Sequence, residues 1–491
     1  MARGSQTIRM ASFAGGEASV FPTGNMPTKY SCRLQNCYFT QTGGVGKIPG
    51  YVAVNAQSLG HSLISGHEFK KLDGTTQLLA AGAGNIYRMD GGTPTLLIGG
   101  LDPGGKVSFV TFPHSDICIF CNGVDLPRKY DGEEVSILGG SPPATASKVH
   151  VHRNRVWFIE KNNRLQPSYS ALYNAEDYTT PNDAGYLDLS SILKSGDEIL
   201  DFFTYVDMLI FFMRNHIAIY SGSNPNADGD FALVQLIEGC GVVAEGTVQG
   251  LGTDCAFLYD SGAKNLRQVV TTGNLTDGEI SAAIGPDIVA EISAGAGRNF
   301  ASAHYPALGF YLVLLGDKIR IFSYARKPWA QIVGAGIYGM FNGTDGKVYF
   351  TGNGHLYQFG VSWTFNGRLP YMLWETAWMS PASRGEKFYP KLMEVLCRPG
   401  SITTVDVDVS FDGKRGEFDR QSFSTPGFSG LMDVPVPDTW DNCFLMDGTD
   451  YEPVRLPMFG GGRSMKLSFS NQTDKNVEIS DIIIPSIIGR L

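Results

Sequence analysis

Two histidines stand close enough together in the sequence to hold a metal ion between them. His150 and His152 alternate in the stretch "VHVHRNR", so in an extended strand both side chains project from the same face. A metal site needs a further ligand, and the surrounding sequence offers none. We therefore favour an ordinary solvated or hydrogen-bonded pair over a metal site.

Cysteine pairs are the second feature that could bind a metal. Cys118 and Cys121 lie in "DICIFCNG", a predicted strand in which residues three apart project to opposite faces. A zinc site would need a second pair, for which Cys32 and Cys37 are only a loose candidate. Eight cysteines in 491 residues are too few for a disulfide scaffold. We expect buried, reduced thiols.

The segment "NPNADGDF" has the spacing of the first half of a calcium-binding loop. It places oxygen-bearing side chains and a glycine at Asn224, Asn226, Asp228 and Gly229. Position twelve of such a loop needs a bidentate glutamate, and here it falls on Gln235. We expect a plain turn.

Four carboxylates raise the question of glycoside hydrolysis, which needs two carboxyl groups about 5 to 10 Å apart. They are Asp254, Asp260, Asp287 and Glu291. Nothing in the sequence pairs them, and the Ser-x-Asp-x-Gly-x-Thr-Trp turn of sialidase-type blades does not occur. The sequence also lacks a G-x-S-x-G nucleophile elbow, a phosphate-binding loop and an H-E-x-x-H zinc helix. We expect a protein that is not an enzyme, with no catalytic residue, no cofactor and no metal site.

The overall charge gives no indication of tight nucleic-acid binding. The net charge is −9, whereas proteins that grip DNA neutralise phosphates with clustered Lys and Arg. The notable basic cluster is Arg153, Arg155, Lys161 and Arg164. We interpret it as the charged face of one sheet, with a nucleic-acid or partner contact as the less favoured alternative.

The start of the chain, "MARGSQTIRMASFAGGEAS", contains no apolar stretch long enough for a secretory signal. We therefore expect the chain to fold where it is made. Asn274, Asn342 and Asn471 stand in glycosylation sequons, which we interpret as coincidence in a protein that is not secreted.

The elements that must position these residues are strands. The run "EILDFFTYVDMLIFFMRNHIAIYSG" is highly apolar, but Arg214, Asn215 and His216 interrupt it well before the 20 or so residues that a membrane span needs. It predicts a hairpin, with one strand from Met208 to Met213 and a second from Ile217 to Tyr220. These would be inner strands, buried on both faces and therefore continuously apolar.

The ending of that hairpin, apolar residues followed by an aromatic and a turn, recurs along the chain. The aromatics are Tyr87, Tyr130, Tyr220, Tyr259, Phe322 and Tyr357. Their spacing suits four-stranded propeller blades, which repeat every 40 to 50 residues or so. We predict a degenerate β-propeller of six or seven blades, in which "KVHVHRNRVWFIEKNN" is a unit without the aromatic ending. "TDGEISAAIGPDIVAEIS" would be a helix or an inserted loop.

After residue 360 the pattern changes to strict alternation. "TTVDVDVSFDG" puts Val405, Val407, Val409 and Phe411 on one face, which predicts a half-exposed strand. "RSMKLSFSNQ" and "NVEISDIIIP" add further strands, so a C-terminal β-sandwich follows. The all-β chain would divide into an N-terminal arm (residues 1–30), a propeller (31–362) and the sandwich (363–491).

These motifs together resemble the tail nozzle, or packaged-DNA stabilisation, proteins of short-tailed bacteriophages. The likeness begins in "NCYFTQTGGVGKIPGYVAVN" with the family's early Asn, Gly turn and basic-x-Pro-Gly, here Asn36, Gly43, Gly44, Lys47, Pro49 and Gly50. It continues in "YSALYNAEDY", similar to a Tyr-Ser-x-x-Tyr-x-Ala/Pro-Glu element, at Tyr169, Ser170, Tyr173, Ala175 and Glu176. The hairpin that ends at Tyr220 and Gly222 corresponds to a further unit, and the order of the motifs agrees over roughly residues 30 to 360.

The resemblance implies a structural virion subunit that is made in the host bacterial cytoplasm and works in the virion tail. In that family the subunit forms a homo-hexameric ring below the portal and adaptor, extends the DNA conduit, retains the packaged genome, and contacts a needle or plug and tailspikes. Six copies at −9 would carry about −54, which lets double-stranded DNA slide through without specific binding. The alternative is a carbohydrate-binding or glycoside-hydrolysing propeller of a tail fibre or a secreted protein.

Overall fold

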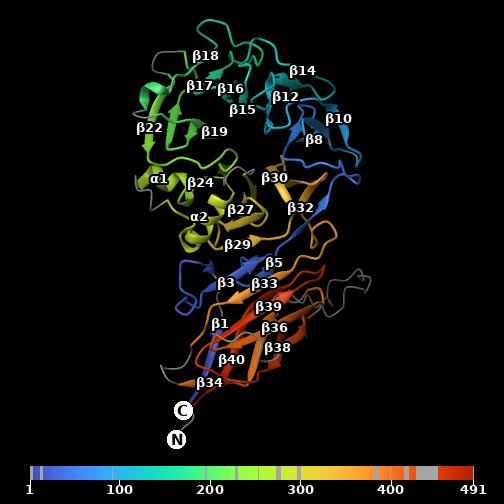
Figure 1. Ribbon diagram of the computed structural model, residues 1–491, viewed down its shortest axis with the longest axis vertical. Coiled ribbons are helices and arrows are strands. Elements are labelled where there is room, and N and C mark those ends of the chain that lie inside the picture. The colour runs from blue at the N-terminus through green and yellow to red at the C-terminus, as the bar shows by residue number, and fades with distance from the viewer. Residues whose placement is uncertain are drawn as a thin grey trace, which may run out of the picture. The chain divides into compact units, whose positions relative to one another are not determined.

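The structure is a computed structural model in which strands predominate and helices are few (Figure 1). It describes residues 4–10, 15–90, 92–193, 196–226, 230–252, 254–272, 278–295, 300–380, 386–398, 400–413, 420–426 and 452–489. The chain divides into two compact units. One comprises Val52–Ile319 and Ala335–Phe359, and the other Met1–Tyr51, Arg320–Gly334 and Gly360–Leu491. We call them the propeller unit and the terminal unit.

In the described part of the chain, the propeller is built from seven groups of strands that follow one another in sequence: five four-stranded sheets, one three-stranded sheet, and three strands of a ten-stranded sheet whose other strands belong to the terminal unit. The first holds β7 (Ser65–Lys70), β8 (Thr76–Gly82), β9 (Asn85–Arg88) and β10 (Thr95–Ile98), and the second holds β11 (Ser108–Phe112), β12 (Ile117–Cys121), β13 (Arg128–Tyr130) and β14 (Val135–Ile137). The third holds β15 (Ala146–His152), β16 (Arg155–Glu160), β17 (Asn163–Tyr169) and β18 (Gly185–Tyr186). The fourth holds β19 (Ile199–Tyr205), β20 (Met208–Met213), β21 (His216–Ser221) and β22 (Ala232–Glu238). The last three are β23 (Gln249–Gly250), β24 (Cys255–Tyr259) and β25 (Gly262–Asn265); β26 (Ala301–Tyr305), β27 (Phe310–Leu315) and β28 (Lys318–Ser323); and β30 (Ile337–Asn342), β31 (Val348–Gly352) and β32 (Leu356–Ser362) with β6 (Gly50–Ala53).

These sheets are the blades of a β-propeller, as the sequence predicted. Neighbouring first strands lie beside one another around the ring, and β30 of the last blade lies beside β7 of the first (Figure 1). The apolar core lies between blades. One cluster packs the third blade against the fourth, and another packs the fourth against the fifth. Burial therefore depends on stacking blades, because a single sheet leaves both faces bare.

The predicted hairpin from Met208 to Tyr220 is confirmed. It forms β20 and β21, joined by a turn at Arg214 and Asn215, and Phe212 lies opposite Ile217. His216 belongs to the second strand, not to the turn. Alternate residues of β20 enter different cores: Phe211 packs toward the third blade and Phe212 toward the fifth. This explains why the strand is apolar at every position.

The repeated aromatics mark the third strand of a blade in five of the six predicted cases, which are Tyr87, Tyr130, Tyr220, Phe322 and Tyr357. Tyr259 differs, since it ends β24, the second strand of the fifth blade. The unit predicted to lack an aromatic ending has one, because its third strand β17 ends at Tyr169.

The ring is closed by pairing across the sequence. The early strand β6 is the outermost strand of the last blade, beside β32, so the blade is built from both ends of the propeller sequence. Asn55 fixes the closure: its Nδ2 donates to the carbonyl oxygens of Gln57 and Gly354, and its Oδ1 accepts from the Leu356 backbone N–H at 2.9 Å. The first blade begins at Ser65 in β7, so β6 precedes it in the sequence. β6 instead completes the seventh and last blade.

The segment predicted as a helix or an inserted loop forms α2 (Gly285–Ala294), after a short helix α1 (Leu266–Thr272). Pro286 stands in the first turn of α2, where its missing N–H costs nothing. Ile288 and Ile292, four residues apart, are buried on one helical face. The helices fill the outside of the three-stranded fifth blade, whose edge pairs with residues 278–280.

The terminal unit contains two sheets that pack face to face as a sandwich. One holds β38 (Glu452–Pro457), β35 (Leu392–Cys397), β40 (Glu478–Gly489), β5 (Val45–Lys47) and β4 (Cys37–Phe39), with β1 (Gly4–Met10) and β34 (Lys387–Pro390) also on β40. The other holds β29 (Trp329–Ile332), β3 (Tyr30–Gln35), β33 (Met372–Thr376), β39 (Met465–Asn471), β36 (Thr404–Phe411) and β37 (Gln421–Ser424), with β2 (Gly16–Glu17) on β3. The rings of Phe388 and Phe411, one from each sheet, lie 6.1 Å apart. Val405, Val407, Val409 and Phe411 are buried, as the alternation predicted.

The first 51 residues group with the terminal unit, so the chain does not divide at the predicted boundary of 30, whereas the boundary predicted at 362 lies close to Gly360, where the terminal unit resumes. The segment predicted as an arm supplies β1, which pairs along its whole length with β40, and β2. Glu17 is buried and accepts from Arg320 at 2.8 Å and from the Leu34 backbone N–H at 3.0 Å. No local sequence pattern indicates these contacts, because pairing with a distant part of the chain leaves no local signal.

No helix in the described ranges is long and apolar enough to cross a membrane.

Candidate functional site

A set of ionisable side chains lies where the first strands of the blades begin. Lys148 on β15 pairs with Asp201 on β19 at 2.8 Å, and Asp201 also accepts the Gly246 backbone N–H at 2.8 Å. Lys106, just before β11, donates to the carbonyl oxygen of Phe300, just before β26, at 2.8 Å. We call these five residues the inter-blade network. It connects the second to the sixth blade across the ring.

The protonation of the two lysines differs within this network. Burial, together with the neighbouring Lys148 cation, lowers the pKa of Lys106 to about 8. Burial also acts to lower the pKa of Lys148, but Asp201 and Glu245 outweigh it and raise the pKa. Each cation is matched by an acceptor, so the network joins blades.

His150 and His152 both point at one threonine. His150 Nε2 lies 2.8 Å from Thr204 Oγ1, and His152 Nδ1 lies 3.1 Å from the same oxygen. The His150 ring also stacks on Phe202, with ring centres 5.8 Å apart. Burial lowers the pKa of both imidazoles to about 4. The histidines therefore join β15 to β19 as a hydrogen-bonded pair, which is the arrangement that the sequence favoured.

The same arrangement recurs between the first two blades, and the sequence analysis missed it. His67 Nε2 on β7 lies 2.8 Å from Thr111 Oγ1 on β11, and the His67 ring stacks on Phe109 at 6.1 Å. In both cases the phenylalanine stands two residues before the threonine, on the same face of the next strand. A search for His followed one blade later by Phe-x-Thr would have found the pair.

The cysteines are buried apart from one another. Cys118 packs in the core between the first and second blades, and Cys121 in the core between the second and third. Burial raises the pKa of both thiols. Cys37 is buried in the terminal unit, whereas Cys32 is partly exposed and lies 3.9 Å from the Met26 sulfur. Among the residues described, no three His, Cys, Asp or Glu side chains gather closely enough to hold a metal ion.

The turn after β21 is closed by its own aspartate. Asp230 accepts from Ser223 and from the Asn224 backbone N–H at 2.6 Å. Asn226 Oδ1 accepts the Tyr169 hydroxyl at 2.9 Å. Asp228 and Gly229 lie outside the described residues, and Gln235 lies in β22, opposite Ile219.

The four carboxylates considered for hydrolysis have separate partners. Asp254 accepts the Cys255 and Arg267 backbone N–H groups. Asp260 pairs with Arg214 at 3.0 Å, and Glu291 pairs with Lys318 at 3.0 Å. The fourth, Asp287, stands in the first turn of α2.

The basic cluster is dispersed by the fold. Arg155 is buried and pairs with Asp183 at 2.8 Å, whereas Arg153 pairs with Asp207 at a hairpin turn and Arg164 with Glu198 and Glu245. Lys161 is exposed. Arg153 and Arg164 thus connect neighbouring blades, whereas Arg155 pairs within the third blade, so the cluster does not form one continuous basic surface.

Two of the three sequon asparagines have side chains that are hydrogen-bonded within the fold. Asn471 is buried and its amide group bonds to Lys47, Thr403 and Thr404. The Asn342 side chain bonds to the His304 backbone, and Asn274 lies outside the described residues.

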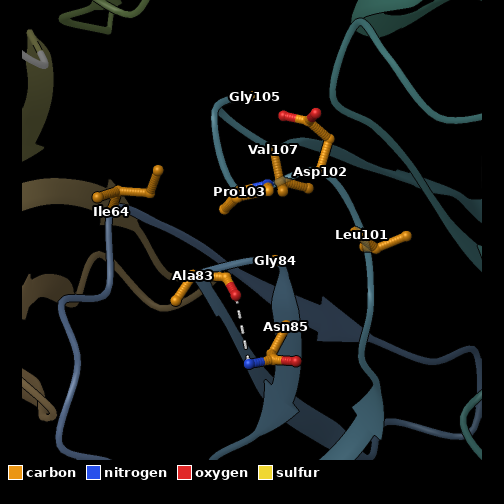
Figure 2. A pocket seen from close by; sticks show the side chains of 10 residues that line it. Ile64, Ala83, Gly84, Asn85, Leu101, Asp102, Pro103, Gly105 and Val107 are labelled. Carbon is orange, nitrogen blue, oxygen red and sulfur yellow. Dashed lines mark hydrogen bonds between the residues drawn. The ribbon is translucent and has the colours of Figure 1, made fainter.

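A shallow pocket lies between the β8–β9 turn and the loop before β11 (Figure 2). Glycines bring backbone close here, since a Cβ on Gly84 would lie 2.2 Å from the Leu101 carbonyl oxygen. Asn85 donates to the Ala83 carbonyl oxygen, so the amide serves the turn itself. The enclosed space is about that of one water molecule, which is too small for a sugar.

The residues that carry the family resemblance are mostly internal connections. Asn36 is buried with φ 52°. Its side chain donates to the Tyr371 carbonyl oxygen and accepts from the Val333 backbone N–H, both at 2.9 Å. Lys47 is buried and donates to Asn471 at 2.9 Å and to the Thr473 carbonyl oxygen.

The second motif behaves in the same way at four of its five positions. The Tyr169 ring packs on Trp157 with centres 4.8 Å apart, and Ser170 accepts the Val156 backbone N–H at 3.0 Å. Ala175 is buried, and Glu176 pairs with Lys129 at 2.6 Å. Tyr173 differs, because it is 49% exposed at φ 60°.

Together these features define a β-propeller protein with a β-sandwich unit formed by both ends of the chain. No family model matches the chain, and no curated protein matches it. Solved structures with similarity to it include the WD40 beta propeller domain of Doa1, at 10% identity over 63% of this chain and 96% of that chain, with TM-score 0.40. YCF48 bound to D1 peptide is similar at 10% identity over 64% of this chain and 97% of that chain, with TM-score 0.40. PorZ of Porphyromonas gingivalis, a component of the type-IX secretion system, is similar at 12% identity over 77% and 46%, with TM-score 0.40.

Proposed function

We propose that this chain is a structural subunit of a bacteriophage tail nozzle, as its resemblance to packaged-DNA stabilisation proteins of short-tailed phages implies. It works as a homo-hexameric ring below the portal and adaptor, extends the DNA conduit and retains the packaged genome. Its further partners are a tail needle or plug and tailspikes. Assembly takes place in the host bacterial cytoplasm, and the mature protein acts in the virion tail.

The observation that carries this proposal is where the motif residues lie. Asn36, Lys47, Tyr169, Ser170 and Glu176 connect strands and loops within their own units. A motif that holds a scaffold together suits a protein whose work is to keep a shape. A substrate-binding propeller would instead direct its motif side chains into a cleft.

Charge also supports a conduit. The net charge of −9 is concentrated in the propeller unit, which has 18 Lys and Arg against 30 Asp and Glu, a net charge of −12. A wall of this sign repels phosphate, so DNA slides and does not adhere.

Native mass spectrometry of the purified chain tests the proposal. We expect a closed assembly of six copies of the 53.2 kDa chain, and negative-stain images of rings that bind isolated tail complexes. A persistent monomer that also fails to bind tail complexes would overturn the proposal.

A glycan-binding screen distinguishes the nozzle from the competing function, a sugar-binding or sugar-cleaving propeller. Saturable glycan binding that is lost in Asp254→Asn or Asp260→Asn would favour it over the nozzle. The nozzle proposal expects no such binding from the wild-type chain.

A further inference from the structure

One face of the propeller unit carries a connected set of hairpin tips. In each blade the turn between the first and second strands and the loop between the third and fourth lie at the same end of the sheet, because the strands are antiparallel. We define the hairpin arc as the tips at residues 71–75, 113–116, 153–154 and 206–207 together with the loop 170–184. It spans the first four blades.

Contacts between tips make the hairpin arc continuous. Asp116 accepts the Leu72 backbone N–H at 2.8 Å, which joins the first blade to the second. The rings of His114 and Tyr173 lie 4.9 Å apart, which joins the second to the third. Arg153 pairs with Asp207 at 3.2 Å, which joins the third to the fourth.

Val206 has a conformation that its side chain does not favour. It is the first residue of the two-residue turn between Tyr205 and Met208, at φ 55°, a position where glycine is usual. A β-branched residue at positive φ is an outlier that costs stability. Val206 is also 77% exposed, so packing within the chain does not offset that cost.

Other apolar side chains on the arc are exposed as well. Leu72 is 71% exposed, and Tyr173 is 49% exposed with φ 60°, again a strained position for a residue other than glycine. The Tyr173 backbone N–H donates to the Asn154 carbonyl oxygen, so the strained residue is fixed against the neighbouring tip. Strain and exposed apolar area thus occur together on one face, as is common where a protein binds a partner.

The charge of the chain indicates the partner. The hairpin arc carries exposed acidic residues, among them Asp73 and Asp207, and belongs to the propeller unit with its net charge of −12. The terminal unit has 21 Lys and Arg against 18 Asp and Glu, a net charge of +3. Two of its arginines reach the surface, where each pairs with a carboxylate of the same unit: Arg420, 63% exposed, pairs with Asp406 at 2.5 Å, and Arg455, 68% exposed, pairs with Glu394 at 3.0 Å.

We propose that the hairpin arc docks a second copy of this chain, on the positively charged terminal unit of that copy. Contact between unlike surfaces is heterologous, and repeated contacts of this kind close into a ring when the rotation allows. The inference rests on the proposed ring and adds the surface through which neighbours meet. Val206, Tyr173 and Leu72 supply the apolar contacts, and the opposite charges orient the copies.

Four variants of the full-length chain test the proposal. Val206→Gly and Asp73→Lys change the arc, whereas Val124→Gly and Asp317→Lys change an exposed valine and an exposed aspartate on turns at the opposite face. Assembly is measured by native mass spectrometry and light scattering at low and high salt, and folding by the thermal midpoint of the monomer under dissociating conditions. We expect both arc variants to weaken association about tenfold or more, and high salt to weaken that of the wild type.

Val206→Gly carries the sharper readout, because it should raise the thermal midpoint while it weakens assembly. A residue with a merely structural role would move both measurements in the same direction. The two control variants should assemble like the wild type. If all four variants assemble into the ring as well as the wild type does, the docking role proposed for the hairpin arc is wrong, but the nozzle proposal is unaffected. A wild-type chain that stays monomeric would overturn both, and a lowered midpoint for Val206→Gly would refute the strain argument.

Discussion

At the scale of residues, the two His–Thr–Phe arrangements show how polar groups are used inside the propeller. His67 and His150 each bond to a threonine on the next blade and stack on the phenylalanine two residues before it. The imidazole thus provides a hydrogen bond and a flat apolar surface between two strands that share no backbone bonds. The histidines that first suggested chemistry are therefore connections between blades.

The pH dependence of stability tests this reading. Burial lowers the pKa of His67 to about 4 in the folded protein, below the ordinary value of 6.5. As the pH falls from about 6.5 to about 4, the unfolded chain binds a proton that the folded chain does not, so stability is lost over that range. We expect His67→Gln, which keeps a neutral hydrogen-bonding group, to reduce the loss by about 1–3 kcal/mol.

Chemical denaturation of wild type and variant at several pH values would measure the effect. His114→Gln is the matched control, because that imidazole is exposed on the surface. An unchanged pH slope in His67→Gln would refute the role given to this histidine.

At the scale of elements, the end of each third strand sets how a blade turns into its last strand. Gly222 follows β21 at φ 129°, and a Cβ on it would lie 1.7 Å from the Asp230 carbonyl oxygen. Only glycine fits this approach of backbone to backbone. Gly222, which follows the hairpin, therefore reflects a packing requirement.

Substitution separates backbone strain from this steric requirement. Gly100→Ala should cost about 1 kcal/mol, because Gly100 has φ 79° but open space around its Cβ position. Gly222→Ala should cost clearly more, about 3 kcal/mol or greater, since the backbone of the fourth blade must move. Urea denaturation compares the two, and equal costs would mean that the close approach does not decide the choice of glycine.

At the scale of the whole molecule, both chain ends take part in one sandwich unit. Removing residues 1–30, the predicted arm, would remove β1 and β2 and leave Arg320 without Glu17. A buried charge that loses its partner costs about 3–5 kcal/mol. We expect the truncated chain to be insoluble, or to lose the unfolding transition of its terminal unit in calorimetry. A truncated chain with an unchanged thermal profile would instead support the prediction that residues 1–30 form an arm.

The local pattern of the sequence was enough to predict the all-β class, the hairpin from Met208 to Tyr220 and the buried face of Val405 to Phe411. It predicted these because a strand records its own burial in the alternation or continuity of its apolar residues. The same pattern predicted blades, since five of the six aromatics lie in the third strand of a blade.

Tertiary structure alone decided which distant segments complete a sheet and which polar groups meet. The pairing of β6 with the last blade, of β1 with β40, and of Lys106 with the Phe300 carbonyl oxygen joins residues about 200 to 480 positions apart. A strand has the same period-two pattern whichever neighbour it pairs with, so its own residues cannot name its partner. The physical reason is that a strand's neighbour is decided only when the ring of blades and the sandwich close, because the whole fold must then satisfy the weak preferences of many strands together.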